Sequence, residues 1–475
     1  MSTISDSWIV RKVWIRNFKS LRDVSIDLEK MNILIGPNGS GKSNIVEAFL
    51  LLKKIYSDSV TINPFLEWWG YDNVVWQKNE RLPIVIGFEA INRGFQLVFE
   101  TTITGIGGRF AFLKERIKID NYAELIREGD VLTIRHNANV IKRNEAKIKK
   151  ALKGIYEENL KFLKSFRSEI IDLKILENEY ETLVKDQFKN LIEREFKLSI
   201  TDLSLLNMAY EAANISIHGI LFKYIFVPHA GRYSTIPMLV FPVREIQKKG
   251  INIKSTNIIE TIKSIIEKMI VLKPISARTI KETIERPKAE TFLKEDGSNV
   301  INILHNLTLM HQRIPQRVKV AIDLFIPNLE LKFELTSDGR ILLKGSLNKL
   351  ELYPPMFPDG LYKMLVYLTA IELNPSILVI DEIENSLHPK AIEILIDELK
   401  NSNFVTIATT HSPAVIDIVD LKNIVLVEYD ERNGTQVYRI ENPDALRRKL
   451  EELGLTVSEG WLYGELRYSQ KTDME

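Results

Sequence analysis

Apolar and polar positions alternate near the start of the chain, and the pattern then becomes helical. The alternation covers residues 14–18 and 24–28 and predicts two half-buried β-strands. Residues 31–35 form a short apolar run that stops at Gly36, which predicts a buried strand. Residues 45–51 carry apolar side chains at helical spacing. A strand, a glycine-rich loop and a helix are therefore expected in that order.

The middle of the chain has a different pattern. Two further strand-like runs, at residues 84–88 and 95–99, precede it. Residues 155–218 contain neither Gly nor Pro, and apolar positions recur there at steps of three and four among Lys and Glu. This spacing predicts amphipathic helices, either packed as a bundle or forming a short protruding hairpin of roughly 45 Å.

Helices and strands alternate again in the last third of the chain. Residues 331–335 and 341–344 predict a hairpin about a turn at 337–340. The later elements are expected as a helix at 361–373, a buried strand at 376–380, a helix at 389–399 and a strand at 404–410. The whole pattern favours an α/β fold.

Composition excludes several classes of protein. Apolar residues make up 45 % of the 475-residue chain and charged residues 27 %, as in soluble globular proteins. The net charge of +1 gives no global positive field for nucleic acid. The absence of Cys excludes disulfides, zinc ribbons and thiol catalysis. No secretory signal and no membrane-spanning apolar run are visible, so we expect a cytoplasmic protein without a membrane partner.

The glycine-rich loop between the buried strand and the helix carries the first candidate chemistry. Gly36 and Gly41 let the backbone fold tightly, so that consecutive N–H groups point at a phosphate. Lys42 supplies positive charge to the β- and γ-phosphates, and the Ser43 hydroxyl coordinates Mg²⁺. ATP and Mg²⁺ are therefore the expected ligands. The predicted nucleotide-binding residues of the loop are Gly36, Asn38, Gly39, Ser40, Gly41, Lys42 and Ser43.

Two acids and a histidine follow later strands. Asp381 comes directly after the predicted strand at 376–380, where a magnesium-binding acid belongs, and Glu382 next to it can polarise an attacking water. Alone, such a pair is also ordinary turn chemistry. His411 ends the next strand and can hydrogen-bond the γ-phosphate or the water. The alternative for His411 is a structural histidine.

These motifs together resemble the ABC-type ATPase heads of the SMC, RecF and OLD (overcoming lysogenisation defect) group. The similarity is carried by residues 36–44 (GPNGSGKSN), 381–389 (DEIENSLHP) and 409–413 (TTHSP). Residues 15–20 (IRNFKS) are similar to the first strand of that group. Residues 295–300 (EDGSNV) resemble a segment of its stand-alone, RecF-like predicted ATPases.

The resemblance covers residues 8–50 and 270–415 and implies a fold and a division of the chain. The implied fold is an α/β P-loop NTPase, an ABC-type head with a helical insertion between the Walker A and Walker B motifs. Residues 1–135 would form the first part of the head, 136–250 a mainly helical insertion, and 251–475 the second part of the head.

The resemblance also implies roles for single residues. Asp381 would be the magnesium-side acid, Glu382 the catalytic base and His411 the switch histidine. The family has a glutamine that senses magnesium, for which Gln77 is the candidate and a surface glutamine the alternative. Its Ser-x-Gly signature, which caps the nucleotide of a second subunit, is replaced here by Pro358-Asp359-Gly360. Gly360 and the helix start are kept, and we expect the Asp359 carboxylate to point away from the phosphate.

The implied function is that of an ATP-hydrolysing switch. It would work as a homodimer or higher oligomer in DNA maintenance or antiviral defence. No acid cluster for a nuclease follows His411, so a nuclease or toxin effector would be a separate chain. DNA is a further expected partner, with basic residues at 142–153 as a candidate surface and a solvated helix face as the alternative. A non-hydrolysing ATP-dependent scaffold and a transporter ATPase subunit are the competing functions.

Overall fold

The computed structural model describes residues 8–56, 63–92, 94–120, 123–128, 131–136 and 258–468. The predicted helical insertion at 136–250, apart from its first residue, and the basic residues at 142–153 lie outside these ranges. The chain divides into two compact units. The first comprises residues 1–8 and 87–264, and the second comprises residues 9–86 and 265–475. Within the described residues, no helix combines the length and the apolar character needed to cross a membrane.

A six-stranded sheet forms the centre of the second unit. Its strand order is β16 (Gly434–Arg439), β15 (Ile424–Asp430), β3 (Met31–Ile35), β14 (Val405–Thr410), β13 (Ile377–Ile380) and β9 (Ile270–Leu272). All neighbouring pairs are parallel except β15 and β16. Every residue of β3, β13 and β14 is buried, as expected for parallel strands that are covered on both faces.

The register of this sheet brings the predicted motifs to one edge. Ile35, the last residue of β3, lies opposite Thr410, the last residue of β14. Ile380, at the end of β13, lies opposite Ala408. Parallel strands end at the same edge of a sheet, so the segments that follow β3, β13 and β14 start close together. The ligand-binding crevice of such sheets forms at this edge.

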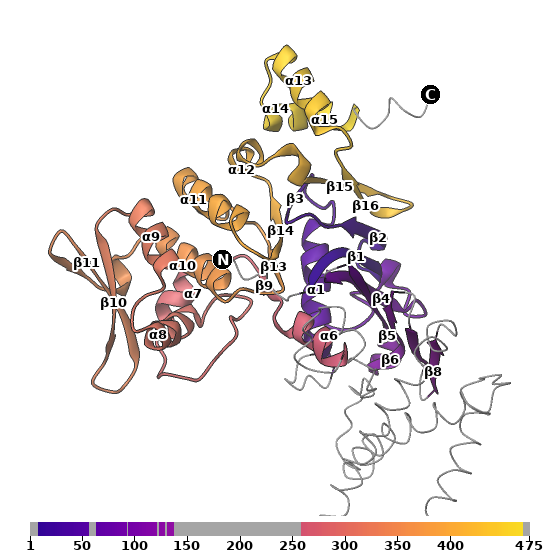
Figure 1. Ribbon diagram of the computed structural model, residues 1–475, viewed down its shortest axis with the longest axis horizontal. Helices are drawn as coiled ribbons and strands as arrows, with labels where there is room; N and C mark the ends of the chain where they lie inside the picture. Colours follow the sequence, from indigo (N-terminus) through magenta and orange to yellow (C-terminus); the bar gives the residue numbers. More distant parts are fainter. Residues whose placement is uncertain are drawn as a thin grey trace, which may run out of the picture. The chain divides into compact units, whose positions relative to one another are not determined.

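Helices of the second unit lie beside this sheet, and α9, α10 and α11 pack against one another there (Figure 1). The helix α10 is buried almost all round and contacts α7, α8, α9 and α11. The helices are α1 (Lys42–Tyr56), α7 (Ala277–Glu282), α8 (Val300–His311), α9 (Gln316–Phe325), α10 (Asp359–Glu372), α11 (Pro389–Lys400) and α12 (Pro413–Ile418). One apolar core joins α7, α8, α9, α10, α11 and α12 to the sheet, and α1 contacts β13 and β9. The predicted strand, loop and helix at 31–51 and the P-loop NTPase fold are thus confirmed.

Two antiparallel hairpins also belong to the second unit. The strands β1 (Ile9–Phe18) and β2 (Leu21–Asp27) confirm the alternation at the start of the chain. The strands β10 (Leu329–Leu335) and β11 (Ile341–Leu347) confirm the later hairpin, and β12 (Leu350–Leu352) extends it. The second unit also contains short 3₁₀ turns, namely η1 (Leu66–Trp68), η2 (Trp76–Lys78), η4 (Pro354–Met356) and η5 (Leu421–Asn423).

Three C-terminal helices follow β16 and were not predicted. They are α13 (Pro443–Leu453), α14 (Val457–Leu462) and α15 (Glu465–Tyr468). The side chain of Asn442 caps α13, and Gly454 ends it in the left-handed conformation. Thr456 and Glu459 form a capping box at α14. Local sequence therefore specifies these helix ends.

The first unit is an antiparallel meander. Its strands are β4 (Ile84–Asn92), β5 (Phe95–Thr104), β6 (Ala111–Ile119), β7 (Ala123–Glu128) and β8 (Val131–His136), in that order, with the turn η3 (Ile106–Gly108) after β5. The strand β4 begins in the second unit and ends in the first. Phe88 and Phe99 pack with ring centroids 5.4 Å apart. The helix α6 (Ile258–Glu267) leads the chain back to the second unit.

Candidate functional site

The loop between β3 and α1 requires glycine at several positions. Gly39 and Gly41 have φ values of 78° and 102°, in the left-handed region that glycine adopts most readily. A Cβ atom on Gly36 would lie 2.0 Å from the carbonyl oxygen of Val427 in β15. The first amides of α1 have no acceptor within the helix, so they remain free to bind an anion. The loop is therefore a cradle of backbone donors at the carboxyl end of β3.

Lys42 bends back over this loop. Its side chain is 5 % exposed, and its Nζ donates hydrogen bonds of 2.9 Å to the carbonyl oxygens of Gly36 and Pro37. Burial lowers the pKa of Lys42, while the nearby carboxylates of Asp381, Glu384 and Glu382 act in the opposite direction. A buried cation beside a row of free amides fits a polyphosphate, whose oxygens would become the acceptors of its protons.

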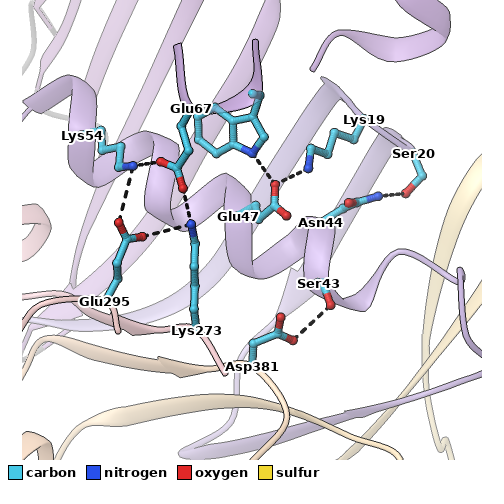
Figure 2. A network of polar contacts seen from close by, with 11 residues as sticks. Lys19, Ser20, Ser43, Asn44, Glu47, Lys54, Glu67, Lys273, Glu295 and Asp381 are labelled. Atoms are coloured by element: carbon cyan, nitrogen blue, oxygen red, sulfur yellow. Dashed lines mark hydrogen bonds and ion pairs between the residues drawn. The ribbon is translucent and has the colours of Figure 1, made fainter. Parts of the chain in front are cut away.

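Ser43 and Asp381 meet beside the loop. The Ser43 Oγ donates to Asp381 Oδ1 at 3.1 Å, as Figure 2 shows, and the Thr409 hydroxyl donates to the same oxygen at 2.6 Å. Hydroxyl and carboxylate oxygens are ligands that suit Mg²⁺. The described residues contain no group of three His, Cys, Asp or Glu side chains that could hold a metal. Mg²⁺ usually takes one or two protein oxygens and completes its shell with phosphate and water oxygens, so this pair of donors fits it.

Glu382 is held in an uncommon backbone conformation. Its φ is 53°, and its amide donates to the Thr409 hydroxyl at 2.8 Å. Its Oε2 accepts from Asn385 Nδ2 at 3.2 Å. Buried Lys363 of α10 fixes Asn385 in turn, through 2.8 Å bonds to its carbonyl and to its Oδ1. A left-handed non-glycine residue held on both sides is typical of functional sites.

His411 is joined to the acidic segment through its backbone. Its amide donates to Glu384 Oε1 at 2.7 Å, and the other oxygen, Oε2, is buried without a hydrogen-bond partner among the described residues. Tyr367 of α10 is fully buried and lies within the field of the same acids. Burial raises the pKa of Tyr367, and Glu384 and Asp381 act in the same direction. Glu384 thus connects the segments after β13 and β14, a role that the sequence analysis did not assign.

The structure brings most of the predicted site residues together. Lys42, Ser43, Asp381 and Glu382 lie around the loop, and the backbone of His411 is attached to them through the neighbouring acid. Gln77 is exposed in η2 with φ of 51°. Among the described contacts, none joins Gln77 or Gly360 to the loop, so their assignments remain predictions.

The start of α10 stands at the predicted signature position. Pro358 is the N-cap. Proline has no hydroxyl, so its side chain makes no cap bond. Asp359 Oδ1 accepts from Lys281 Nζ at 2.7 Å, and that ammonium lies 5.5 Å from the ring centre of Tyr362. An aspartate carboxylate near a phosphate would repel it. The Lys281 ammonium offsets the negative charge of Asp359 and so reduces that repulsion.

A ring of alternating charges fixes the outer face of α1, as Figure 2 shows. Lys54 of α1 and Lys273 after β9 both pair with Glu67. Both also approach Glu295, at 3.7 Å and 3.3 Å respectively. Partly buried networks hold elements more firmly than isolated surface pairs do. The segment at 295–300, noted for its resemblance, is thereby anchored to the helix that follows the phosphate loop.

Replacing Gly41 by Ala is expected to destabilise the protein more than the same change at Gly39. The new Cβ at position 41 would lie 2.0 Å from Thr435 Oγ1 and 2.6 Å from Ser20 Oγ, whereas at position 39 nothing lies within 4 Å. Both variants carry about 1–2 kcal/mol of left-handed strain, and only Gly41→Ala adds overpacking of about 1–3 kcal/mol. Urea unfolding midpoints measure the difference, and equal midpoints would contradict the described packing.

Comparison with known proteins gives a family and several partial similarities. A protein family described as "AAA domain, putative AbiEii toxin, Type IV TA system" matches residues 31–135 and 160–417, which is more than half of the chain. The chromosome partition protein Smc of Methanocaldococcus jannaschii is 43 % identical over 58 residues, which are 12 % of this chain and 5 % of that protein. The present chain thus corresponds to a small part of that relative.

Solved structures of SMC heads are also similar in outline. An SmcHead bound to the C-winged helix domain of ScpA gives a TM-score of 0.44 at 12 % identity, covering 90 % of this chain and 97 % of that one. A second structure is the Smc head domain of Pyrococcus furiosus, which has an extended coiled coil and is bound to the C-terminal domain of ScpA. Its TM-score is 0.40 at 14 % identity, and the match covers 94 % of this chain and 99 % of that one. The SMC head domain of Thermotoga maritima gives a TM-score of 0.38 at 12 % identity. That match covers 91 % of this chain and 100 % of that one.

Proposed function

The chain belongs to this AAA-domain family of P-loop proteins, and from that premise we propose that it binds ATP with Mg²⁺ and hydrolyses it. One observation carries the proposal. The Asp381 carboxylate accepts hydrogen bonds from both Ser43 and Thr409. Glu382 is the next residue in the chain, and both carboxylates act on the buried ammonium of Lys42. Phosphate-binding, metal-binding and water-activating groups are therefore held at one edge of one sheet.

Each group has a separate task in the proposed reaction. The loop amides and Lys42 bind the phosphates and neutralise their charge, and Ser43 and Asp381 hold the ion. When bound, Mg²⁺ stabilises the negative charge on the phosphate oxygens. Glu382 orients a water molecule and takes its proton as the water oxygen bonds to the γ-phosphorus. The bond from the γ-phosphorus to its bridging oxygen breaks, so that ADP and phosphate leave.

We further propose that two copies act together in a defence system with a separate effector. The description of the matching family refers to a toxin–antitoxin system, and the match covers most of the chain. This supports a role in defence over one in DNA maintenance. The resemblance of the motifs to paired ATPase heads supports a dimer or a higher oligomer. The changed signature at Pro358 favours one alternative, a scaffold that binds ATP without hydrolysing it.

The proposal is tested by measuring ATP turnover and oligomeric state together. Purified protein would be assayed with and without Mg²⁺ and double-stranded DNA, and its mass followed by light scattering with ATP or a non-hydrolysable analogue. Turnover that requires Mg²⁺ supports the ATPase. Stimulation by DNA would favour DNA maintenance over defence. Nucleotide-dependent assembly without turnover under any condition would replace the ATPase by the scaffold.

A further inference from the structure

The phosphate loop is contacted by a residue from the far end of the chain. Thr435, at the start of β16, is fully buried, and its Oγ1 donates to the carbonyl oxygen of Ser40 in the loop at 2.8 Å. Its amide donates to the carbonyl oxygen of Ser20, in the turn between β1 and β2, at 2.8 Å. Two bonds thus hold Thr435 between that turn and the phosphate loop.

Four groups form one chain of hydrogen bonds whose direction can be assigned. Asn44 Nδ2 donates to Ser20 Oγ at 2.6 Å (Figure 2), and Ser20 Oγ lies 2.7 Å from Thr435 Oγ1. A hydroxyl has one proton, and the carbonyl oxygen of Ser40 can only accept. Thr435 therefore donates to Ser40, and Ser20 must donate to Thr435. The chain runs without a break from α1 back to the loop.

This chain fixes the peptide group at the centre of the loop. In a trans peptide the carbonyl and the following N–H point in opposite directions. The bond from Thr435 to the Ser40 carbonyl therefore directs the Gly41 amide away from β16. The two hydroxyls also lie where a Cβ on Gly41 would be, at 2.0 Å and 2.6 Å. The Gly41 backbone is thus packed directly against them.

We propose that Thr435 is a positioning residue that sets the phosphate loop in its nucleotide-binding shape before the nucleotide arrives. This inference rests on the proposed ATP site. A loop that is already shaped loses less conformational entropy on binding, so the hydroxyl contributes to nucleotide affinity. Without it, the Ser40 carbonyl is a buried acceptor that can be satisfied only if the loop moves.

The test compares three threonine variants by titration with a fluorescent ATP analogue and Mg²⁺. Thr435→Val keeps the shape, removes the hydroxyl and is expected to weaken binding about ten-fold. Thr435→Ser keeps the hydroxyl and should bind like wild type. Thr406→Val is the matched control, because Thr406 is fully buried in β14 and its hydroxyl has no hydrogen-bond partner in the described structure. Its affinity should not change.

Two further measurements separate positioning from general stability. In nucleotide-free protein, amide hydrogen exchange at residues 36–44 should be faster in Thr435→Val than in Thr406→Val. The KM of turnover should rise with the Kd, while kcat stays near that of wild type. Ser20→Ala interrupts the same chain of hydrogen bonds and is also expected to weaken nucleotide binding. This variant tests the inference if Thr435→Val does not fold.

The outcomes distinguish this inference from the function on which it rests. Wild-type affinity in both Thr435→Val and Ser20→Ala would overturn the role of Thr435 and leave the ATP site intact. An equal loss in Thr406→Val would also overturn it, because the effect would then belong to any buried hydroxyl of the sheet. A wild-type protein that does not bind the analogue would overturn the ATP site itself.

Discussion

Replacing Glu382 by Gln is expected to lower the rate of ATP hydrolysis about 10²–10⁴-fold, the usual contribution of a general base. Nucleotide affinity should stay close to that of wild type. The glutamine keeps the size of the side chain and an oxygen that can accept from Asn385 Nδ2, which lies 3.2 Å from Glu382 Oε2. What is lost is the carboxylate that accepts the proton of water. Single-turnover hydrolysis and analogue titration measure the two effects separately.

Glu393→Gln provides the control for this variant. Glu393 is exposed on α11, so the same chemical change there should leave both turnover and binding unaltered. Unreduced turnover in Glu382→Gln would remove Glu382 from its assigned role. A large loss of affinity in that variant would show instead that the carboxylate shapes the binding site.

Replacing Lys42 by Ala is expected to weaken ATP binding about 10²–10³-fold, equivalent to about 3–4 kcal/mol. The Lys42 ammonium is buried and lies within the field of Asp381, Glu384 and Glu382. Without it, the three acids would face the phosphates and the ammonium that opposes their charge would be lost. Equilibrium titration with the fluorescent analogue measures the loss.

Lys390→Ala is the matched control for the lysine prediction. Lys390 is exposed near the start of α11, so the change removes a positive charge of the same size from the protein surface. Its effect should be small and should vanish at high salt, because solvent screens exposed charges. Binding by Lys42→Ala at wild-type strength would contradict the placement of phosphate at the loop.

Much of the fold is predictable because its signals are local. The apolar run at 31–35 and the loop after it follow one another directly, and both form as expected. The helix predicted at 361–373 is α10, which begins two residues earlier, because an acid such as Asp359 suits the first helical turn. Asp381 could be identified because it directly follows a fully buried strand.

The supporting residues of the site could not be predicted in the same way. Thr435 contacts a loop that lies 395 positions earlier in the sequence, and no neighbouring residue indicates that partner. Lys363 reads as one polar position on a helix, although it is buried against Asn385. Only the tertiary arrangement decides which of many similar side chains meet, so the sequence predicts the motifs better than their supports.

The position of β3 in the sheet has a consequence for synthesis of the protein. This strand lies between β14 and β15, which the ribosome adds more than 370 residues later. Until then its four apolar residues and the polar Asn32 have no neighbours in their own sheet. Pairings between such distant segments form slowly and leave apolar surface open to aggregation. The nascent chain would therefore expose this apolar strand until β14 and β15 had been synthesised.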